Sequence, residues 1–237
     1  MKINGKRAIL EALQANQPIQ DITLSSAMQH HQEVKKLLHS AHEKNIPIYT
    51  LSPRDFKHRY ADNDTQGIVA NCKEISFKPL SILNTDPTQY PKIVILDHLE
   101  DPYNMGAIIR TCEGLGINAL IFGKDRQVKL TPGVIKAASG AVYHLPLIQV
   151  SNIAQAITTL KKTGYWIYGT DVTNGCNINT AHINHPFALV IGNEHKGISK
   201  RISKMVDLNL HIPMRGHTDS LNVSVATGII LHTLVGR

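Results

Sequence analysis

The sequence IVILDHLEDPYNMGAIIRTCEGLGINALIFG occupies residues 93–123 and contains two apolar runs separated by a helical stretch. The first run, IVIL (93–96), is continuous, which is typical of a strand buried on both faces. The helical stretch covers residues 104–114, and the second run is ALIFG (119–123). Because parallel strands need a long crossover connection, usually a helix, this segment predicts a pair of parallel strands.

Strand-like and helical stretches continue to alternate after residue 123. The strand-like runs are VYHLPLIQV (142–150), YWIYGT (165–170), FALVIG (187–192) and LNLHIPM (208–214), and the helical stretches lie at 132–138 and 151–162. This alternation predicts an α/β fold with a mostly parallel sheet that is covered by helices on both sides.

The last segment, LNVSVATGIILHTLVG (221–236), fits two kinds of element. Its first residues alternate like a strand, whereas its length and its position at the end of the chain favour a helix. A helix that is apolar on so much of its surface must be covered by its own domain or by a second subunit.

The first seventy-odd residues predict a separate, compact α/β unit. Helical faces are recognised at 5–14 and 33–44, and strand-like runs at 19–25, 46–51 and 67–71. Three prolines interrupt any regular element within residues 76–92, so this segment is interpreted as a linker. The expected domains are therefore 1–75 and 93–237, joined by the linker 76–92.

Composition narrows the class of protein. The net charge is +7, and a basic surplus favours an anionic partner, most commonly a nucleic acid. No apolar run approaches the roughly 18 residues that cross a bilayer, and the first residues lack the apolar core of a signal peptide, so membrane insertion and secretion are not expected. The three cysteines are far apart, which predicts a reducing, cytoplasmic location and argues against a disulfide framework or a zinc site.

Polar residues gather in the loops that follow the predicted strands. In an open parallel sheet, ligands bind at the carboxyl ends of strands, which here lead into 97–116, 169–171, 191–199 and 212–224. These loops contain no GxGxxG sequence, no Walker lysine motif and no metal-ligand spacing. Taken singly, each loop is also compatible with ordinary turn and capping chemistry.

Three of these blocks together resemble a known family. DPYNMGAIIRT (101–111), GNEHKGI (192–198) and IPMRGHTDSLNVSVA (212–226) are similar, in this order, to the three signature motifs of the SpoU (TrmH-like) family of RNA ribose 2′-O-methyltransferases, which belongs to the SPOUT superfamily. KAASGAVYHLPL (136–147) resembles a further segment of that family. In the second motif, His195 stands where a glycine is common.

The resemblance implies a fold, a cofactor and partners. The fold is a parallel sheet with a C-terminal deep trefoil knot, which periodicity alone does not predict. The cofactor is S-adenosylmethionine, and the working unit is a homodimer; no metal is expected, because the sequence contains no metal-ligand set. The N-terminal unit is similar to the small ribosomal-protein-like (L30e-like) RNA-binding domain of the family, except that Thr65, Gln66 and Gly67 replace the usual His-Gln-Gly.

The resemblance also implies which residues form the site. Arg110 is expected to be the central catalytic residue, and the residues around it are Asn104, Glu194, Ser220 and Asn222. The cofactor is expected beside Thr170, Gly192, Asn193, Ile212, Met214 and Leu221.

Chemistry suggests roles for two of these groups. A guanidinium group stays protonated at neutral pH, so Arg110 is interpreted as holding a substrate phosphate and stabilising the developing alkoxide rather than acting as a base. Glu194 either orients its neighbours or accepts the proton.

Three hypotheses about the function stay open at this point. The two-part architecture favours a guanosine of large-subunit (23S) ribosomal RNA, and tRNA is the second reading. The third is a non-catalytic RNA-binding protein on the same scaffold, which would be expected to lose the polar residues of the motifs. DNA is not expected as a partner.

Overall fold

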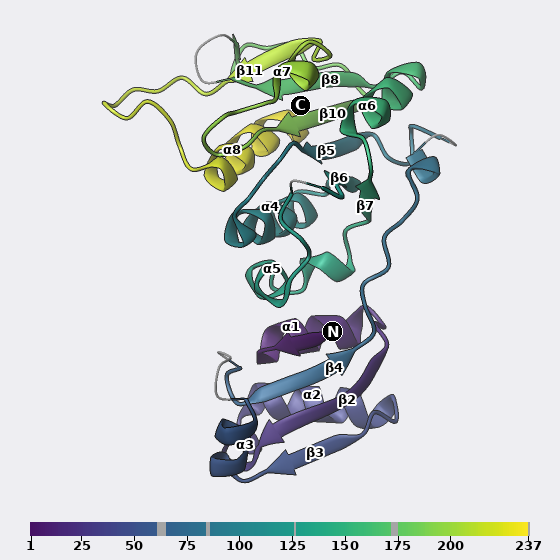
Figure 1. Ribbon diagram of the computed structural model, residues 1–237, viewed down its shortest axis with the longest axis vertical. Helices are drawn as coiled ribbons and strands as arrows, with labels where there is room; N and C mark the ends of the chain where they lie inside the picture. The colour runs from purple at the N-terminus through teal and green to yellow at the C-terminus, as the bar shows by residue number, and fades with distance from the viewer. Residues whose placement is uncertain (61–64, 84–85, 126, 172–174, 237) are drawn as a thin grey trace. The chain divides into compact units, whose positions relative to one another are not determined.

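The computed structural model describes residues 1–60, 65–83, 86–125, 127–171 and 175–236 (Figure 1). The chain divides into two compact units. The first comprises Met1–Ser76 together with Leu130–His144, and the second comprises Phe77–Lys129 together with Leu145–Arg237. Each unit has its own sheet.

The first unit is built on a four-stranded mixed sheet. The strand order is β1 (Lys2–Asn4), β4 (Ile68–Cys72), β2 (Ile19–Ser25) and β3 (Ile48–Leu51). β4 is antiparallel to both of its neighbours, whereas β2 and β3 are parallel. The helices are α1 (Lys6–Gln14), α2 (Gln32–Glu43), α3 (Pro53–Arg59) and α5 (Pro132–Ala137), with the short 3₁₀ helices Ser26–Met28 and Ala141–Tyr143.

Sequence periodicity predicted most of this unit but missed β1, α3 and the two 3₁₀ helices. β1 is three residues long, too short for an alternating pattern to be recognised. α3 begins at a serine–proline pair, where Ser52 caps the helix by accepting a hydrogen bond from the Asp55 amide at 3.1 Å. Proline at the first helical position is a start signal that fits this short helix.

Residues 130–144 belong to the first unit, although the sequence groups them with the second domain, 93–237. Gly140 adopts φ +92°, and a Cβ at this position would stand 2.1 Å from Cβ of Glu11 on α1. His144 Nε2 lies 3.4 Å from Oε2 of the same glutamate. A glycine therefore allows this segment to approach α1 closely.

The second unit contains a seven-stranded sheet in which all the paired strands are parallel. Its order is β7 (Leu147–Val150), β6 (Ala119–Gly123), β5 (Lys92–Leu96), β10 (Phe187–Ile191), β8 (Trp166–Thr170), β11 (Leu208–His211) and β9 (Cys176–Asn177). The helices are α4 (Pro102–Gly114), α6 (Ile153–Lys162), α7 (Lys200–Ser203) and α8 (Val223–Val235), with a 3₁₀ helix at Leu80–Leu83. The predicted mostly parallel sheet is confirmed, and the trefoil knot stays a prediction.

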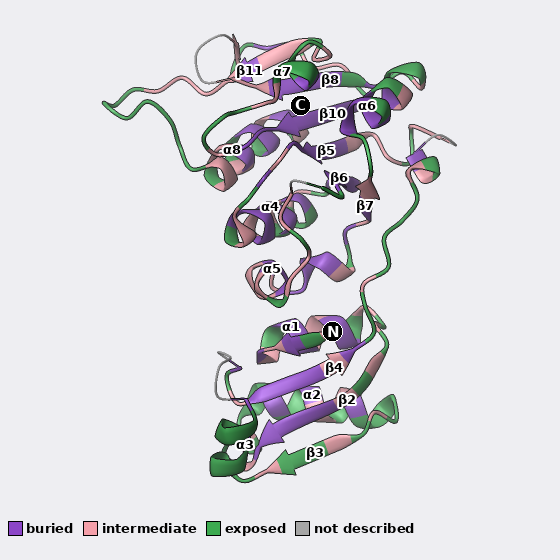
Figure 2. Ribbon diagram, viewed as in Figure 1, coloured by how far each residue is buried: buried purple, intermediate pink, exposed green. Residues whose placement is uncertain are grey.

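The central strands of this sheet are buried, as Figure 2 shows for β5, β6 and β10. On one side of the sheet, Ile93 and Ile95 of β5 share a core with Ile157 and Leu160 of α6. α4 packs against α8. A strand covered on both faces explains why its sequence is a continuous apolar run.

The structure corrects the predicted strand at 142–150 and decides between strand and helix for 221–236. The run at 142–150 is a strand only from Leu147, because a 3₁₀ helix and Pro146 precede it. The last segment is a helix, α8, which begins after Asn222. The Asn222 side-chain oxygen accepts hydrogen bonds from the amides of Ser224 at 2.9 Å and Val225 at 3.4 Å, so an N-cap fixes the start of the helix.

Within the described part of the chain, no helix combines the length and the apolar character needed to span a membrane. The same residues contain no group of three or more His, Cys, Asp or Glu side chains placed to hold a metal ion.

Candidate functional site

A pocket of about 430 Å³ lies where β8, β10 and β11 end. The loops that follow these three strands converge on it, as expected for the carboxyl edge of a parallel sheet. Its lining includes the predicted residues Thr170, Gly192, Asn193, Glu194, Ile212, Met214, Ser220 and Leu221. All six residues expected to bind a cofactor therefore border one hollow.

The loop at 191–199, here called the pocket loop, is shaped by its glycines. A Cβ on Gly192 would stand 2.2 Å from the carbonyl carbon of Gly197 and 2.3 Å from the amide nitrogen of Ile198, so only glycine fits there. The backbones of Asn193 and Gly197 exchange two hydrogen bonds, of 3.0 and 2.9 Å. These contacts close a tight turn that lines one wall of the pocket.

Asn193 is a buried residue that organises this turn from the inside. Its side-chain oxygen accepts hydrogen bonds from the amides of His195 at 3.0 Å and Lys196 at 3.1 Å. Its side-chain nitrogen donates to the carbonyl oxygen of His98 at 2.8 Å. Asn193 therefore links the pocket loop to the segment that follows β5.

A chain of hydrogen bonds connects the three motifs. Asn104 on α4 donates from Nδ2 to Oε1 of Glu194 at 3.2 Å, and its Oδ1 accepts from Nδ2 of Asn222 at 3.0 Å. The three residues belong to three different motifs, separated by 90 and 118 positions in the sequence. The polar motif residues thus contact one another directly in the fold.

Glu194 is also held by the main chain that leads into α4. Its carboxylate accepts from the amides of Glu100 at 3.4 Å and Asp101 at 3.3 Å. Asp101 in turn caps α4, because its Oδ1 accepts from the Tyr103 amide at 2.8 Å. With three donors on its two oxygens, Glu194 acts in the structure as a fixed connector between the pocket loop and α4.

The remaining predicted catalytic residues lie in different places. Ser220 lines the pocket, whereas Asn104 and Asn222 are not among the described lining residues; Asn104 bonds to the lining residue Glu194, and Asn222 bonds to Asn104. Arg110 is exposed on α4 and is not among the described residues that line the pocket. The structure therefore brings together every predicted site residue except Arg110.

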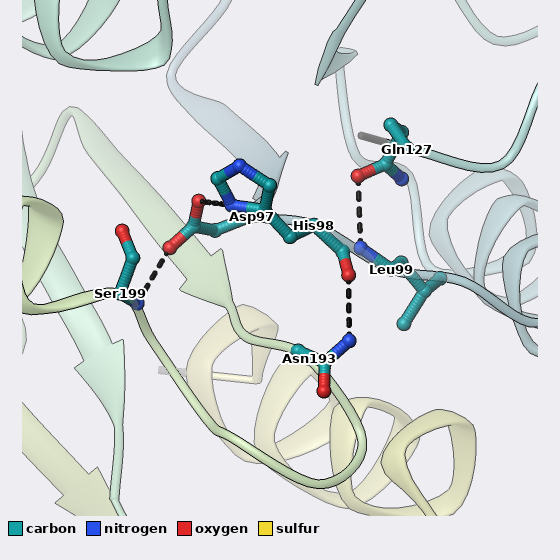
Figure 3. Close-up of polar contacts among 6 residues, drawn as sticks. All are labelled: Asp97, His98, Leu99, Gln127, Asn193 and Ser199. Atoms are coloured by element: carbon teal, nitrogen blue, oxygen red, sulfur yellow. Dashed lines mark hydrogen bonds and ion pairs between the residues drawn. The ribbon is translucent and has the colours of Figure 1, made fainter. Parts of the chain in front are cut away.

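Several residues of the site were not predicted. Asp171, Lys196, His211 and Asp219 line the pocket and give it charged or titratable walls. A second group surrounds Asp97, the first residue after β5, as Figure 3 shows. A carboxylate directly after an apolar strand was the available signal for Asp97.

Two of the three cysteines are buried core residues. Cys112 of α4 is fully buried, and burial raises the pKa of its thiol above the usual range. In the first unit, burial likewise raises the pKa of Cys72 to about 12. The reactive form of cysteine is the thiolate, so both groups stay protonated at neutral pH and act as core residues.

The hydrogen-bonded chain through Asn104 makes a testable prediction. Asn104→Asp replaces the donor to Glu194 by a second carboxylate at the same place, so at pH 8 the free energy of unfolding should fall by about 1–3 kcal/mol. The loss should shrink towards pH 4, because protonation removes the repulsion. Urea unfolding at both pH values measures the difference.

Asn104→Ala is the uncharged control, because it removes the donor to Glu194, and also the acceptor for Asn222, without adding a charge. Its loss of stability should not depend on pH. Equal pH profiles for the aspartate and alanine variants would contradict a close contact between residue 104 and Glu194.

Comparison with known families and sequences gives a consistent picture. Residues 91–232 match the model of the SpoU rRNA Methylase family, and residues 2–78 match the model described as RNA 2′-O ribose methyltransferase substrate binding. A putative TrmH family tRNA/rRNA methyltransferase of Staphylococcus aureus (strain MSSA476) is 33% identical over 232 residues, covering 97% of this chain and 93% of the relative. A protein of the same description from Staphylococcus haemolyticus (strain JCSC1435) is 33% identical over 233 residues, with the same coverage.

Solved structures share the fold. The SpoU methyltransferase AviRb from Streptomyces viridochromogenes, in complex with AdoMet, has a TM-score of 0.82 at 22% identity and covers 100% of this chain and 89% of its own. The AdoMet-bound rRNA methyltransferase from Sinorhizobium meliloti has a TM-score of 0.80 at 22% identity, with 98% and 85% covered. The A. aeolicus TrmH/SpoU tRNA modifying enzyme is 31% identical, covers 66% of this chain and 81% of its own, and has a TM-score of 0.56.

The family model spans the sheet, the two motifs that line the pocket and the first motif on α4, and the relatives match nearly the whole chain. The chain therefore belongs to the SpoU rRNA methylase family.

Proposed function

We propose that this SpoU-family methyltransferase transfers the methyl group of S-adenosylmethionine to a ribose 2′-hydroxyl of RNA, with the cofactor in the pocket at the ends of β8, β10 and β11. The observation that carries the proposal is the convergence of the second and third motifs, together with the loop after β8, on one hollow of about 430 Å³, with the first motif joined to them through the Asn104–Glu194 hydrogen bond. This volume lies in the range of about 300–1,000 Å³ that small-molecule sites occupy. The AdoMet-bound structures of AviRb and of the Sinorhizobium meliloti enzyme support it.

The lining of the pocket fits this cofactor. Ile212, Met214 and Leu221 supply apolar surface for a purine ring, and the turn at Gly192 lets the main chain approach a ligand closely. Asp171 and Asp219 are acceptors for hydroxyl or ammonium groups. When bound, S-adenosylmethionine supplies an electrophilic methyl group on a positively charged sulfur.

Arg110 acts on the RNA in this proposal. Its side chain is exposed on α4, where a phosphate can reach it from solvent. A guanidinium group binds phosphate with a planar pair of donors and stabilises negative charge that develops on an alkoxide. A ribose hydroxyl is a poor nucleophile at neutral pH, so this stabilisation lowers the barrier to attack.

Glu194 orients its neighbours rather than accepting the proton. Both of its oxygens already accept hydrogen bonds, from two main-chain amides and from Asn104. These three donors hold the carboxylate in one position between the pocket loop and α4, which suits an orienting role. Asn104 and Asn222 complete the same support by joining α4 to the start of α8.

The N-terminal unit recruits RNA in this proposal, and α3 is its best-suited surface. Arg54, Lys57, His58 and Arg59 are all exposed on this short helix, which is anchored by the buried rings of Phe56 and Tyr60. This helix carries one exposed acidic residue, Asp55, whereas the exposed face of α2 mixes its lysines with two, Glu33 and Glu43. A hollow of about 310 Å³ beside α3 has Lys57 in its lining.

Ribosomal RNA is the substrate class that we favour, with a guanosine of the large-subunit RNA as the target. The similarity to the Sinorhizobium meliloti rRNA methyltransferase extends over 98% of this chain, whereas the similarity to the A. aeolicus tRNA modifying enzyme extends over only 66%. The relatives are named for both RNAs. A tRNA is the alternative substrate.

A homodimer in the cytoplasm completes the proposal. Val225 and Ile229 of α8 are 50% and 38% exposed and lie four residues apart, so they share one helix face. Covering this apolar face by a second copy would remove it from water.

The role of Arg110 can be tested by substitution. Arg110→Ala should reduce methyl transfer by about 10²–10³, because one preorganised charged donor is lost from the reacting oxygen. Cofactor binding should be unchanged, since Arg110 is not among the described lining residues. Arg110→Lys should restore little, because an ammonium group lacks the planar fork. Single-turnover assays with saturating RNA measure the rates.

Two further variants make this test specific. Glu194→Gln should be milder than Arg110→Ala if Glu194 only orients its neighbours. Glu113→Ala changes another exposed residue of α4 and should leave the rate unchanged. Methylation by Arg110→Ala at nearly the normal rate would remove this residue from the mechanism.

Recruitment of RNA by α3 can be tested by neutralising its charges. The triple variant Arg54→Ala, Lys57→Ala, Arg59→Ala should weaken RNA binding and make the affinity less dependent on salt, lowering the slope of the log–log plot by about 2–3. A second triple variant, Lys35→Ala, Lys36→Ala, Lys44→Ala, removes the same charge from exposed positions of α2 and its end. Equal losses in both variants would mean that α3 has no special role.

The substrate is tested by mapping 2′-O-methyl groups in RNA from cells with and without this protein. We expect one methyl group to disappear from large-subunit ribosomal RNA, since that RNA is the favoured substrate. Loss from a tRNA would move the assignment to the alternative. Identical maps, together with intact RNA binding, would favour the non-catalytic reading.

A further inference from the structure

The corner between β5 and α4 holds the pocket loop at three points. The Asp97 amide donates to the carbonyl oxygen of Ile191 at 2.8 Å, where the loop begins. The carbonyl oxygen of His98 accepts from the side chain of Asn193 at 2.8 Å. At the end of the loop, the Ser199 amide donates to Oδ2 of Asp97 at 2.7 Å (Figure 3).

Asp97 is unusual because its carboxylate is wholly buried. Its exposed fraction is 0%, and its other oxygen, Oδ1, lies 2.6 Å from Nδ1 of His98. A buried carboxylate is costly unless each oxygen has a partner. Here one partner belongs to its own segment and the other to the pocket loop, 102 residues further along the chain.

The corner that carries Asp97 is itself firmly held. His98 adopts φ +64°, a conformation that residues other than glycine rarely take. The next residue, Leu99, donates from its amide to Oε1 of Gln127 at 2.8 Å and accepts from the Val128 amide at 2.8 Å. Because the bonds to Gln127 and Val128 hold its backbone in place, the corner can in turn hold the pocket loop in place.

We propose that Asp97 is a positioning residue for the cofactor pocket. It accepts the Ser199 amide and thereby fixes the distance between the two ends of the pocket loop, so that Gly192, Asn193 and Ile198 line the hollow in one arrangement. Asp97 is not among the described lining residues, so its effect on a ligand passes through the loop. The inference rests on the proposed function only in taking S-adenosylmethionine as the ligand.

Three variants separate positioning from general stability. Asp97→Ala removes the acceptor for Ser199. Asp97→Asn keeps an oxygen for Ser199, and its new amide group can donate to Nδ1 of His98 when the imidazole is neutral. Ile148→Ala is the control, because Ile148 is equally buried but lies on β7, which β6 and β5 separate from β10.

Binding of S-adenosylmethionine by calorimetry and the steady-state constants provide the first measurement. Asp97→Ala should raise the Kd and the KM for the cofactor by about 10- to 100-fold, the loss that follows from one charge-assisted hydrogen bond. The KM for RNA should not change. Asp97→Asn should bind nearly as the wild type, and Ile148→Ala should lower the thermal midpoint without changing the Kd.

Hydrogen exchange of the amides at 191–199 provides a measurement that needs no ligand. Exchange should be faster in Asp97→Ala, and restored in Asp97→Asn. Normal cofactor binding and exchange in Asp97→Ala would overturn the inference, as would an equal loss of affinity in Ile148→Ala or a failure of Asp97→Asn to restore binding. Absence of cofactor binding by the wild type would overturn the proposed function instead, and the exchange rates would still decide the role of Asp97.

Discussion

The site depends on the side chain of Asn104, which must donate one hydrogen bond and accept another at the same time. Asn104 donates to Glu194 and accepts from Asn222, so it joins the pocket loop, α4 and the start of α8. Among side chains of this size, only a primary amide offers both functions in one plane. Its burial strengthens the constraint, because a polar group without partners is costly away from water.

The pocket loop is placed by two independent sets of contacts. Glu194 ties its middle to α4, and Asp97 ties its end to β5. Between them, the backbone bonds of Asn193 and Gly197 close the turn. A loop held at several points loses little further freedom when a ligand binds, which favours affinity. The wall of the pocket is therefore largely formed before any ligand arrives.

Much of this arrangement could be predicted from the sequence, and the limits have physical causes. Buried parallel strands give continuous apolar runs, so β5, β6 and β10 are recognisable, and parallel strands bring their following loops to one edge. β1 and β9 are too short to show a period. The bond between Asp97 and Ser199 joins residues 102 positions apart and depends on the order of β5 and β10 in the sheet, which no local pattern encodes. The contact of segment 130–144 with Glu11 is hidden from the sequence for a similar reason, since it depends on long-range packing.

The proposed division between recruitment and chemistry follows from how charges recognise RNA. Contacts to phosphates fix the position of a nucleic acid but carry no sequence information directly. Basic side chains such as those of α3 can therefore supply affinity without choosing a nucleotide. The choice of ribose then falls to the neighbourhood of the pocket, where a hydroxyl must lie in line with the methyl group before transfer can occur. Rigid contacts at Asn104 and Asp97 serve this requirement, because a displacement of the loop by about 1 Å is enough to reduce a reaction that depends on alignment about 10²-fold.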